Sequence, residues 1–269
     1  MPSKVKSFNL RRMPGFTPIA LAIFVILYAP IVSLVVYSFN SESSVGVWGG
    51  WSLRWYVSAW NNEAIQRATL NSIQIAIISG AAATVMALMA ALAMTRTRPY
   101  RGLTTKYALL NQPLMVPEIV TGVALLIVFA RIKVWTGYTG PAYIFLAHTA
   151  FCIPFAYLPI RARLIGMDLT YERAAADLYA PPWATFRYVT LPLLAPGALA
   201  GFLLAFAISL DNVVISEFVK SGGQDTLPTY MLGQLRRDMT PEVNAAATVL
   251  LVISILAVSV FFVFNRKKN

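Results

Sequence analysis

Long apolar stretches alternate with short polar segments along this chain of 269 residues. Five of the stretches, residues 13–41, 68–95, 134–160, 188–210 and 243–265, carry no charged side chain, and a sixth, residues 107–130, carries only Glu118. A helix needs about 20 mostly apolar residues to cross the hydrocarbon of a bilayer, and each stretch is long enough. The pattern predicts an all-α integral membrane protein with six transmembrane helices, at about Phe16–Phe39, Thr69–Thr95, Tyr107–Ala130, Pro141–Arg161, Leu194–Val219 and Asn244–Phe264.

The composition and the placement of charge agree with a protein embedded in a lipid bilayer. Hydrophobic residues make up 58% and charged residues 12% of the chain, well below the roughly 25% charged content of soluble domains. Six crossings put both termini on one side. The segments on that side are the N-terminus, residues 96–106, residues 161–187 and the tail, and they carry fifteen of the 22 Lys and Arg residues. The positive-inside rule therefore predicts cytoplasmic termini, and the net charge of +11 does not indicate a nucleic-acid partner.

Residues that could carry chemistry within the chain are few. The single cysteine, Cys152, excludes an intramolecular disulfide. His148 lies four residues before it on one helical face, but no third ligand is near in the sequence, so an interhelical hydrogen bond from His148 is favoured over a metal site. The sequence contains no Gly-x-x-x-x-Gly-Lys-Ser/Thr loop, no His-Glu-x-x-His motif and no convincing nucleophile–base pair. We therefore expect no catalysis and no cofactor in this chain.

The polar segment between the fourth and fifth crossings predicts two short surface helices. Good helix formers fill Tyr171 to Tyr179, and the acidic Glu172 near the start suits the helix dipole. Ala180-Pro181-Pro182 would end this helix, and a second is predicted over Trp183–Val189, ended by Leu191-Pro192.

One face of the first of these helices would be small and apolar. Ala174, Ala175 and Leu178 fall on adjoining faces, which would allow the close approach of a partner surface. Arg173 and Asp177 could then fix the orientation of that partner. The pattern alone leaves open a loop that only packs against the ends of its own helices.

The loop resembles a motif of ABC importer permeases: Glu-Ala-Ala, three residues, Gly, nine residues, Ile, one residue, Leu-Pro. Ala174-Ala175, Asp177-Leu178 and Leu191-Pro192 fall in register with it. Arg173 stands at the glutamate position, Tyr179 at the turn glycine and Val189 at the isoleucine. The loss of the glycine matters if that position needs a positive φ.

The resemblance implies that the loop, at about residues 165–192, inserts into a cleft of a separate ATPase subunit and transmits its movements. The residues that it implies for coupling are Glu172, Arg173, Ala174, Ala175, Asp177, Leu178, Tyr179, Leu191 and Pro192.

Further short matches extend the resemblance over almost the whole chain. They look like the second permease subunit of bacterial spermidine/putrescine importers, with six helices of the type I ABC importer permease kind. The matching segments are Tyr28-Ala29-Pro30, Tyr37-Ser38-Phe39-Asn40, Gln112 to Glu118, Ala147 to Cys152, Ser209 to Asn212 and Thr240 to Ala245.

The resemblance implies a single permease domain over residues 1–269 in the bacterial inner membrane. The implied partners are a second permease subunit, two ATPase subunits that bind ATP and Mg, and a periplasmic binding protein that delivers the polyamine. The family commonly has two consecutive aspartates where this chain has Asp211-Asn212.

Ionisable groups inside the hydrocarbon usually face a cavity or a partner, which makes Glu118 and Asp211 candidates for a cation path. On a regular helix Glu118 would lie roughly 18 Å beyond Lys106, near the membrane midplane. Ser209, Asn212 and Ser216 would form a polar stripe beside Asp211. Either carboxylate could instead bond an adjacent helix end and hold the bundle together.

Three other functions remain open at this stage. The cargo could be another small cation or an amino acid, because Asn212 removes one negative charge. A secondary transporter would need no ATPase and often shows inverted repeats, and no clear repeat relates the two halves here. A single-chain membrane enzyme would need a catalytic Ser or Cys with a partner base.

Overall fold

The computed structural model describes residues 16–44, 46–96, 101–235 and 241–266. Apart from one isolated bridge between Asn40 and Trp51, the regular elements of these residues are helices. Two compact units are distinguished, residues 1–59 with 239–248 and residues 60–238 with 249–269. The basic residues of both predicted cytoplasmic termini before residue 16 and after residue 266 lie outside the described residues, as do Arg98 and Thr240.

The first unit contains α1 (Phe16–Tyr37), most of α2 (Arg54–Asn61) and the start of α13 (Pro241–Arg266). Asn40 organises the loop between α1 and α2. Its side-chain amide donates to the Val47 carbonyl oxygen at 2.6 Å and its Oδ1 accepts from the Gly49 N–H at 2.9 Å, while its own carbonyl accepts from Trp55 Nε1 at 2.7 Å. Buried backbone and indole donors of this loop are thereby satisfied.

Five helices are long and apolar enough to cross a membrane, which confirms the all-α membrane fold. They are α1, α3 (Glu63–Thr95), α6 (Glu118–Thr136), α7 (Ala142–Ile165) and the continuous helix Pro182–Leu210. The sixth predicted crossing is α13, in which the apolar stretch Pro241–Leu256 is shorter.

The third predicted crossing, Tyr107–Ala130, is not one helix. The structure divides it into α4 (Leu103–Leu110), α5 (Gln112–Met115) and the start of α6. Val116 is extended, with φ −93° and ψ 137°, because the ring of Pro117 disfavours helical backbone in the residue before it. Glu118 therefore lies in the first turn of α6 and not at mid-height of a regular helix.

The fifth predicted crossing, Leu194–Val219, is also interrupted. The structure has α10 (Leu191–Leu210), a break at residues 211–213 and α11 (Val214–Val219). The Asn212 side chain accepts the Ile215 N–H at 2.9 Å and so caps the new helix.

At its other end α10 continues from the surface helix α9 (Pro182–Thr185) through the π-helical turn η2 (Phe186–Thr190). The predicted end of a helix at Leu191-Pro192 was wrong. Proline in a regular helix clashes with the carbonyl four residues earlier, and the wider π turn makes room for that carbonyl. The Leu191 N–H bonds to the Phe186 carbonyl, five residues back, so the helix passes Pro192 without ending.

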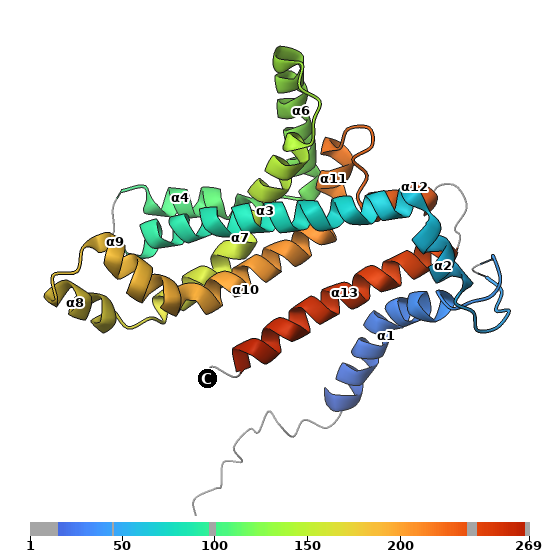
Figure 1. Cartoon of the computed structure of the whole chain (residues 1–269), viewed down its shortest axis with the longest axis horizontal. Coiled ribbons are helices and arrows are strands. Elements are labelled where there is room, and N and C mark those ends of the chain that lie inside the picture. Colours follow the sequence, from blue (N-terminus) through green and yellow to red (C-terminus); the bar gives the residue numbers. More distant parts are fainter. Residues whose placement is uncertain (1–15, 45, 97–100, 236–240, 267–269) are drawn as a thin grey trace, which may run out of the picture. The chain divides into compact units, whose positions relative to one another are not determined.

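The core of the second unit lies where α3, α7 and α10 pack together (Figure 1). Small residues allow this close packing, as is typical of helices in lipid. A Cβ added at Gly201 of α10 would lie only 2.7 Å from the Ala156 carbonyl oxygen of α7. Figure 1 also shows α8 (Thr170–Asp177) and α9 at one end of α10, and α11 and α12 (Leu227–Leu235) at the other.

Candidate functional site

The α8–α9 hairpin, residues 168–190, corresponds to the predicted coupling loop. Asp168 begins α8, because its Oδ1 accepts the Thr170 N–H at 2.9 Å and the Thr170 hydroxyl at 2.7 Å. These hydrogen bonds, the backbone one first, lower the pKa of the Asp168 carboxyl. Asp168 therefore initiates the helical backbone at the beginning of the hairpin.

Tyr179 ends α8 in a left-handed conformation, with φ +60°. The Ala180 N–H bonds to the Ala175 carbonyl at 3.0 Å and the Tyr179 N–H to the Ala176 carbonyl at 2.9 Å. This pair of bonds is a Schellman motif, which requires a left-handed residue and usually has glycine there. The position at which the importer motif has its turn glycine therefore does need a positive φ, and in this chain Tyr179 adopts it.

Glu172 fixes α8 to the membrane helices. Its Oε1 accepts the Thr190 hydroxyl at 2.9 Å and lies 3.4 Å from Nη2 of Arg96, which follows α3. Sequence reasoning missed Arg96 and Thr190. The only available signal was the basic character of residues 96–106, which does not identify a partner.

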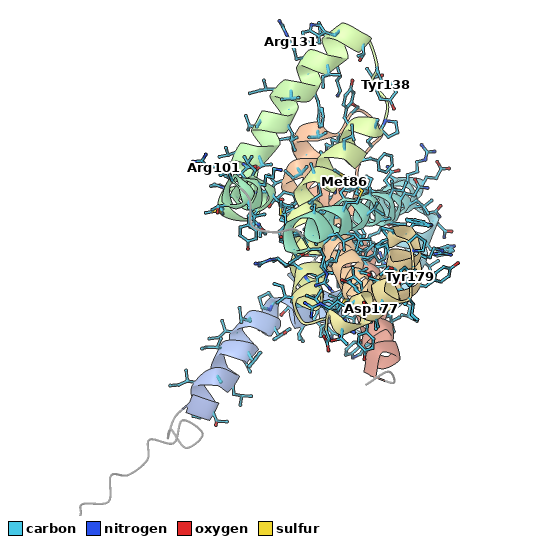
Figure 2. All side chains as sticks on the ribbon, turned by 90° about the vertical axis from the view of Figure 1, so that its left-hand side faces the viewer. Met86, Arg101, Arg131, Tyr138, Asp177 and Tyr179 are labelled. Carbon is cyan, nitrogen blue, oxygen red and sulfur yellow. The ribbon has the colours of Figure 1, made fainter. Side chains whose placement is uncertain are left out.

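The outer surface of the hairpin is unusually apolar for a polar connection. Leu178 is 81% exposed, Tyr179 95%, Trp183 70% and Tyr188 76%. Figure 2, viewed from the side of Figure 1 on which α8 lies, labels Tyr179 and Asp177 close to each other. Exposed aromatic groups gathered on one surface are typical of protein–protein interfaces.

The other residues predicted for coupling fall in two places. Arg173, Ala174 and Asp177 are exposed on α8, and Ala175 is half-buried. Leu191 and Pro192 lie in the first turn of α10, beyond the hairpin.

At the opposite end of α10 a buried polar cluster joins four helices. We define the His148 cluster as His148 of α7, Ser209 of α10, Asn212 and Ser216 at α11, and Glu118 of α6. His148 is 1% exposed, with Nδ1 2.8 Å from Ser209 Oγ and Nε2 2.9 Å from Ser216 Oγ. The expected interhelical hydrogen bond from His148 is confirmed, and His148 makes two.

The hydrogen bonds of the cluster have a definite direction. The Ser216 hydroxyl donates to the Asn212 carbonyl oxygen at 2.7 Å, so its oxygen is left to accept from the Nε2–H of His148. With one proton on the ring, Nδ1 accepts from the Ser209 hydroxyl. The chain of bonds then continues from the Asn212 side-chain amide to Glu118 Oε1.

The predicted path residues therefore differ in their surroundings. Ser209, Asn212 and Ser216 are buried and bonded inside the cluster. Glu118 is half-buried and Asp211, at the end of α10, is exposed. Of the two carboxylates, Asp211 is the more accessible to a ligand.

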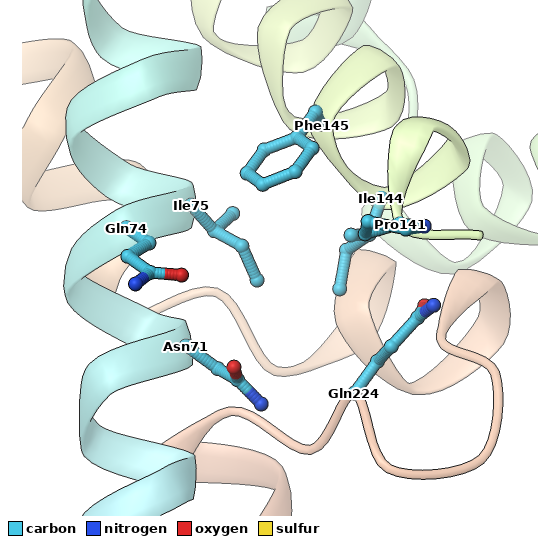
Figure 3. A pocket seen from close by; sticks show the side chains of 7 residues that line it. All are labelled: Asn71, Gln74, Ile75, Pro141, Ile144, Phe145 and Gln224. Atoms are coloured by element: carbon cyan, nitrogen blue, oxygen red, sulfur yellow. The ribbon is translucent and has the colours of Figure 1, made fainter.

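A cavity of about 250 Å³ lies between α3, the start of α7 and the loop after α11 (Figure 3). Amide side chains face it from Asn71, Gln74 and Gln224, and Phe145 forms part of its apolar wall. None of the predicted path residues lines it.

A second cavity, of about 300 Å³, is lined by Glu217, Lys220, Asp225 and Tyr230 among others. Lys220 Nζ lies 2.7 Å from Glu217 Oε2 and 2.8 Å from Asp225 Oδ1. Burial opposes the charge on Lys220, but the hydrogen bonds to Asp225 and Glu217 outweigh burial and raise the pKa of this ammonium group.

Known proteins resemble this chain over most of its length. Residues 83–268 match the family described as binding-protein-dependent transport system inner membrane component. The putrescine transport system permease protein PotI of Escherichia coli (strain K12) is 38% identical over 89% of this chain and 86% of its own length. The spermidine/putrescine transport system permease protein PotC of Haemophilus influenzae is 36% identical, over 92% and 95%.

Solved structures share the fold. A bacterial ABC transporter involved in the import of the acidic polysaccharide alginate matches with a TM-score of 0.71 and 15% identity, over 93% of each chain. The MetNI methionine ABC transporter matches with a TM-score of 0.63 and 18% identity, over 79% of this chain and 98% of that one. The chain therefore belongs to the family of inner membrane components of binding-protein-dependent transport systems, as a multi-pass, non-catalytic permease subunit of an ABC importer.

Proposed function

We propose that the chain forms half of a translocation path for polyamines, putrescine or spermidine, in the bacterial inner membrane. A periplasmic binding protein delivers the cargo, a second permease subunit forms the other half, and two ATPase subunits bind ATP and Mg. The cargo is inferred from the names and the identity of the relatives. Both termini lie in the cytoplasm, as the distribution of Lys and Arg predicts.

The exposed apolar surface of the α8–α9 hairpin is the observation that carries the proposal. It falls in register with the permease motif and offers Leu178, Tyr179 and Trp183 to a cytoplasmic partner. The helix Pro182–Leu210 runs without interruption from this hairpin to the break at Asp211, a rise of about 44 Å. When the ATPase dimer closes on ATP, it moves the hairpin. The helix carries this movement across the bilayer, and the path opens outward. Hydrolysis of ATP then returns the path to its inward-facing state.

Glu118 and Asp211 supply the negative charge that an alkylammonium cargo needs along this path. Asn212 donates to one oxygen of Glu118 and holds the carboxylate in place. Ser209 and Ser216 lie buried behind these groups, where His148 holds them, and support the path from within the cluster. A charge inside the membrane is costly, so a carboxylate with an accessible face and a fixed neighbour is suited to a passing cation.

The docking part of the proposal is tested by Ala174→Arg combined with Leu178→Asp in the full transporter. The charges oppose close approach, so we expect the ATPase subunits to be lost on purification while the permease still inserts. Ala174→Ser combined with Leu178→Met is the matched control and should retain the ATPase. Unchanged ATPase retention in the charged variant would contradict the docking role.

The path is tested by ATP-dependent uptake of labelled putrescine and spermidine. Asp211→Asn and Glu118→Gln each remove one carboxylate with little change of volume, and both should reduce uptake while ATPase retention stays normal. The resemblance implies two consecutive aspartates where this chain has Asp211-Asn212. The missing negative charge favours a second candidate cargo, a less charged cation or an amino acid. Competition of uptake by such compounds, with no competition by polyamines, would replace the polyamine assignment.

A further inference from the structure

Tyr179 has an unusual combination of backbone and side-chain surroundings. Among the described residues it is the one non-glycine residue with a positive φ. Its side chain is 95% exposed, so contacts within the chain cannot offset the cost of that backbone conformation. Glycine would close the same Schellman motif without the cost. The ring is therefore retained for something outside the chain.

We propose that Tyr179 is a specificity residue for the ATPase partner, whose surface holds the aromatic ring in an apolar pocket. This inference rests on the docking of the α8–α9 hairpin proposed above. An ATPase shaped for glycine at this position has no room for the ring. Tyr179 thus selects one ATPase by a favourable contact and rejects others by a clash.

The geometry of the hairpin supports an inserted ring. The left-handed turn places Tyr179 just beyond the last residues of α8, next to Leu178, which is also exposed. Trp183 continues the apolar surface onto α9, where its ring packs against Phe186 at 5.7 Å between centroids. Tyrosine loses only two side-chain torsions on binding, and buried tyrosine and tryptophan rings dominate many interfaces. Tyr179 lies where such an anchor would be most exposed to a partner.

The experiment compares Tyr179→Ala, Tyr179→Gly and Tyr179→Phe in the assembled transporter, by the dissociation constant of the ATPase for the permease. Ala and Gly should both weaken binding at least tenfold, which corresponds to about 1.4 kcal/mol. Phe keeps the ring and should stay within about threefold of the native chain, a difference of less than 1 kcal/mol. Retention of full affinity by the Gly variant would overturn the proposal, because Gly also relieves the backbone.

Tyr138→Ala is the matched control, since Tyr138 is an exposed tyrosine that follows α6 and lies outside the hairpin. It should leave affinity within about threefold of the native chain, less than 1 kcal/mol. A loss equal to that of Tyr179→Ala would remove the special role of Tyr179. In a second arm, an ATPase from a permease that has glycine here should bind Tyr179→Gly at least tenfold more tightly than the native chain. Equal binding would count against selection by this residue.

Failure of this inference is distinguishable from failure of the proposed function. If the Tyr179 variants keep the ATPase and the Ala174→Arg, Leu178→Asp variant loses it, the hairpin docks but Tyr179 does not select. If the charged variant also keeps the ATPase, the docking role itself is wrong.

Discussion

The two ends of α10 differ in which side chains are buried and which are exposed. At the His148 cluster, polar groups are buried and each ring nitrogen of His148 has a hydroxyl partner. At the α8–α9 hairpin, large apolar side chains are exposed and Tyr179 holds a strained backbone with its ring in the open. The polar groups of the first region are satisfied within the chain, whereas the apolar side chains of the second are left exposed by it.

The contrast separates a region whose interactions stabilise the fold of the permease from a region whose side chains are free to contact a partner. A hydroxyl within the membrane has no water to replace a lost partner, so hydrogen bonds at the cluster must be complete. In the proposed function the hairpin lies in the cytoplasm, and its apolar surface stays uncovered until the ATPase binds. Substitutions at the cluster should therefore change stability first, and substitutions at the hairpin should change assembly first.

The largest expected effect comes from His148→Leu. It leaves the Ser209 and Ser216 hydroxyls buried without their partner, and we expect a loss of about 2–3 kcal/mol of unfolding free energy. Thermal unfolding of the purified permease measures it. Adding Ser209→Ala and Ser216→Ala removes the unsatisfied hydroxyls and should recover part of the loss. Unchanged stability of His148→Leu would show that the cluster is not the stable end of α10.

Gly201→Ala should have the next largest effect. The added methyl group would meet the Ala156 carbonyl oxygen at 2.7 Å and push α10 away from α7, at about 1–3 kcal/mol of unfolding free energy. Because α10 connects the His148 cluster to the α8–α9 hairpin, ATPase retention should fall together with stability. Gly233→Ala on α12 is the control, since a Cβ there meets nothing within 4 Å. Independent changes of stability and retention would contradict a rigid connection through α10.

Tyr179→Gly should change stability less and in the opposite direction. Release from the left-handed region gains about 1–2 kcal/mol, part of which is offset because glycine has a more flexible unfolded state, leaving about 0.5–1 kcal/mol. Tyr179→Ala removes the same ring but keeps a Cβ, so it should give no such gain. Thermal unfolding of the isolated permease separates the two. Equal stability of the Gly and Ala variants would mean that the backbone is not strained at this residue.

The sequence predicts where the chain crosses the membrane better than how each helix runs. The length of an apolar stretch shows whether a helix formed by it can cross the bilayer, and five crossings follow from these lengths. Continuity depends on local groups: Pro117 makes Val116 extended, and the Asn212 side chain starts a new helix. Neither event changes the hydropathy pattern, so helix ranges predicted from hydropathy continue through both interruptions.

The candidate site divides in the same way. The hairpin is recognisable because its residues lie close in sequence, and the glycine position gave a reason to expect a positive φ at Tyr179. The His148 cluster depends on pairs 61 and 68 residues apart, and one sequence does not show which serines a histidine meets. The contact of Arg96 with Glu172 was hidden for the same reason.

The smallest expected effect concerns the start of α8 and its response to acid. The bonds from Thr170, together with nearby Arg173, lower the pKa of Asp168 below its ordinary value of 3.8. The contribution of ionised Asp168 to the hairpin is therefore complete above pH 3.8 and is lost as the pH falls through the lower value of the folded protein. Hydrogen exchange at the Thr170 amide, corrected for intrinsic rates, should show protection at pH 6 and less protection near pH 3.

Asp168→Asn is the variant that isolates this group, because its side-chain oxygen still accepts from Thr170 but does not titrate. Its protection should be nearly independent of pH over the same range. An equal loss of protection in the native protein and in Asp168→Asn would assign the effect to groups other than Asp168. A loss confined to the native chain would show that α8, in the hairpin at the exposed end of α10, is held at its first turn by a single charged cap. At the buried end, by contrast, the bonds of His148 are to uncharged hydroxyl groups.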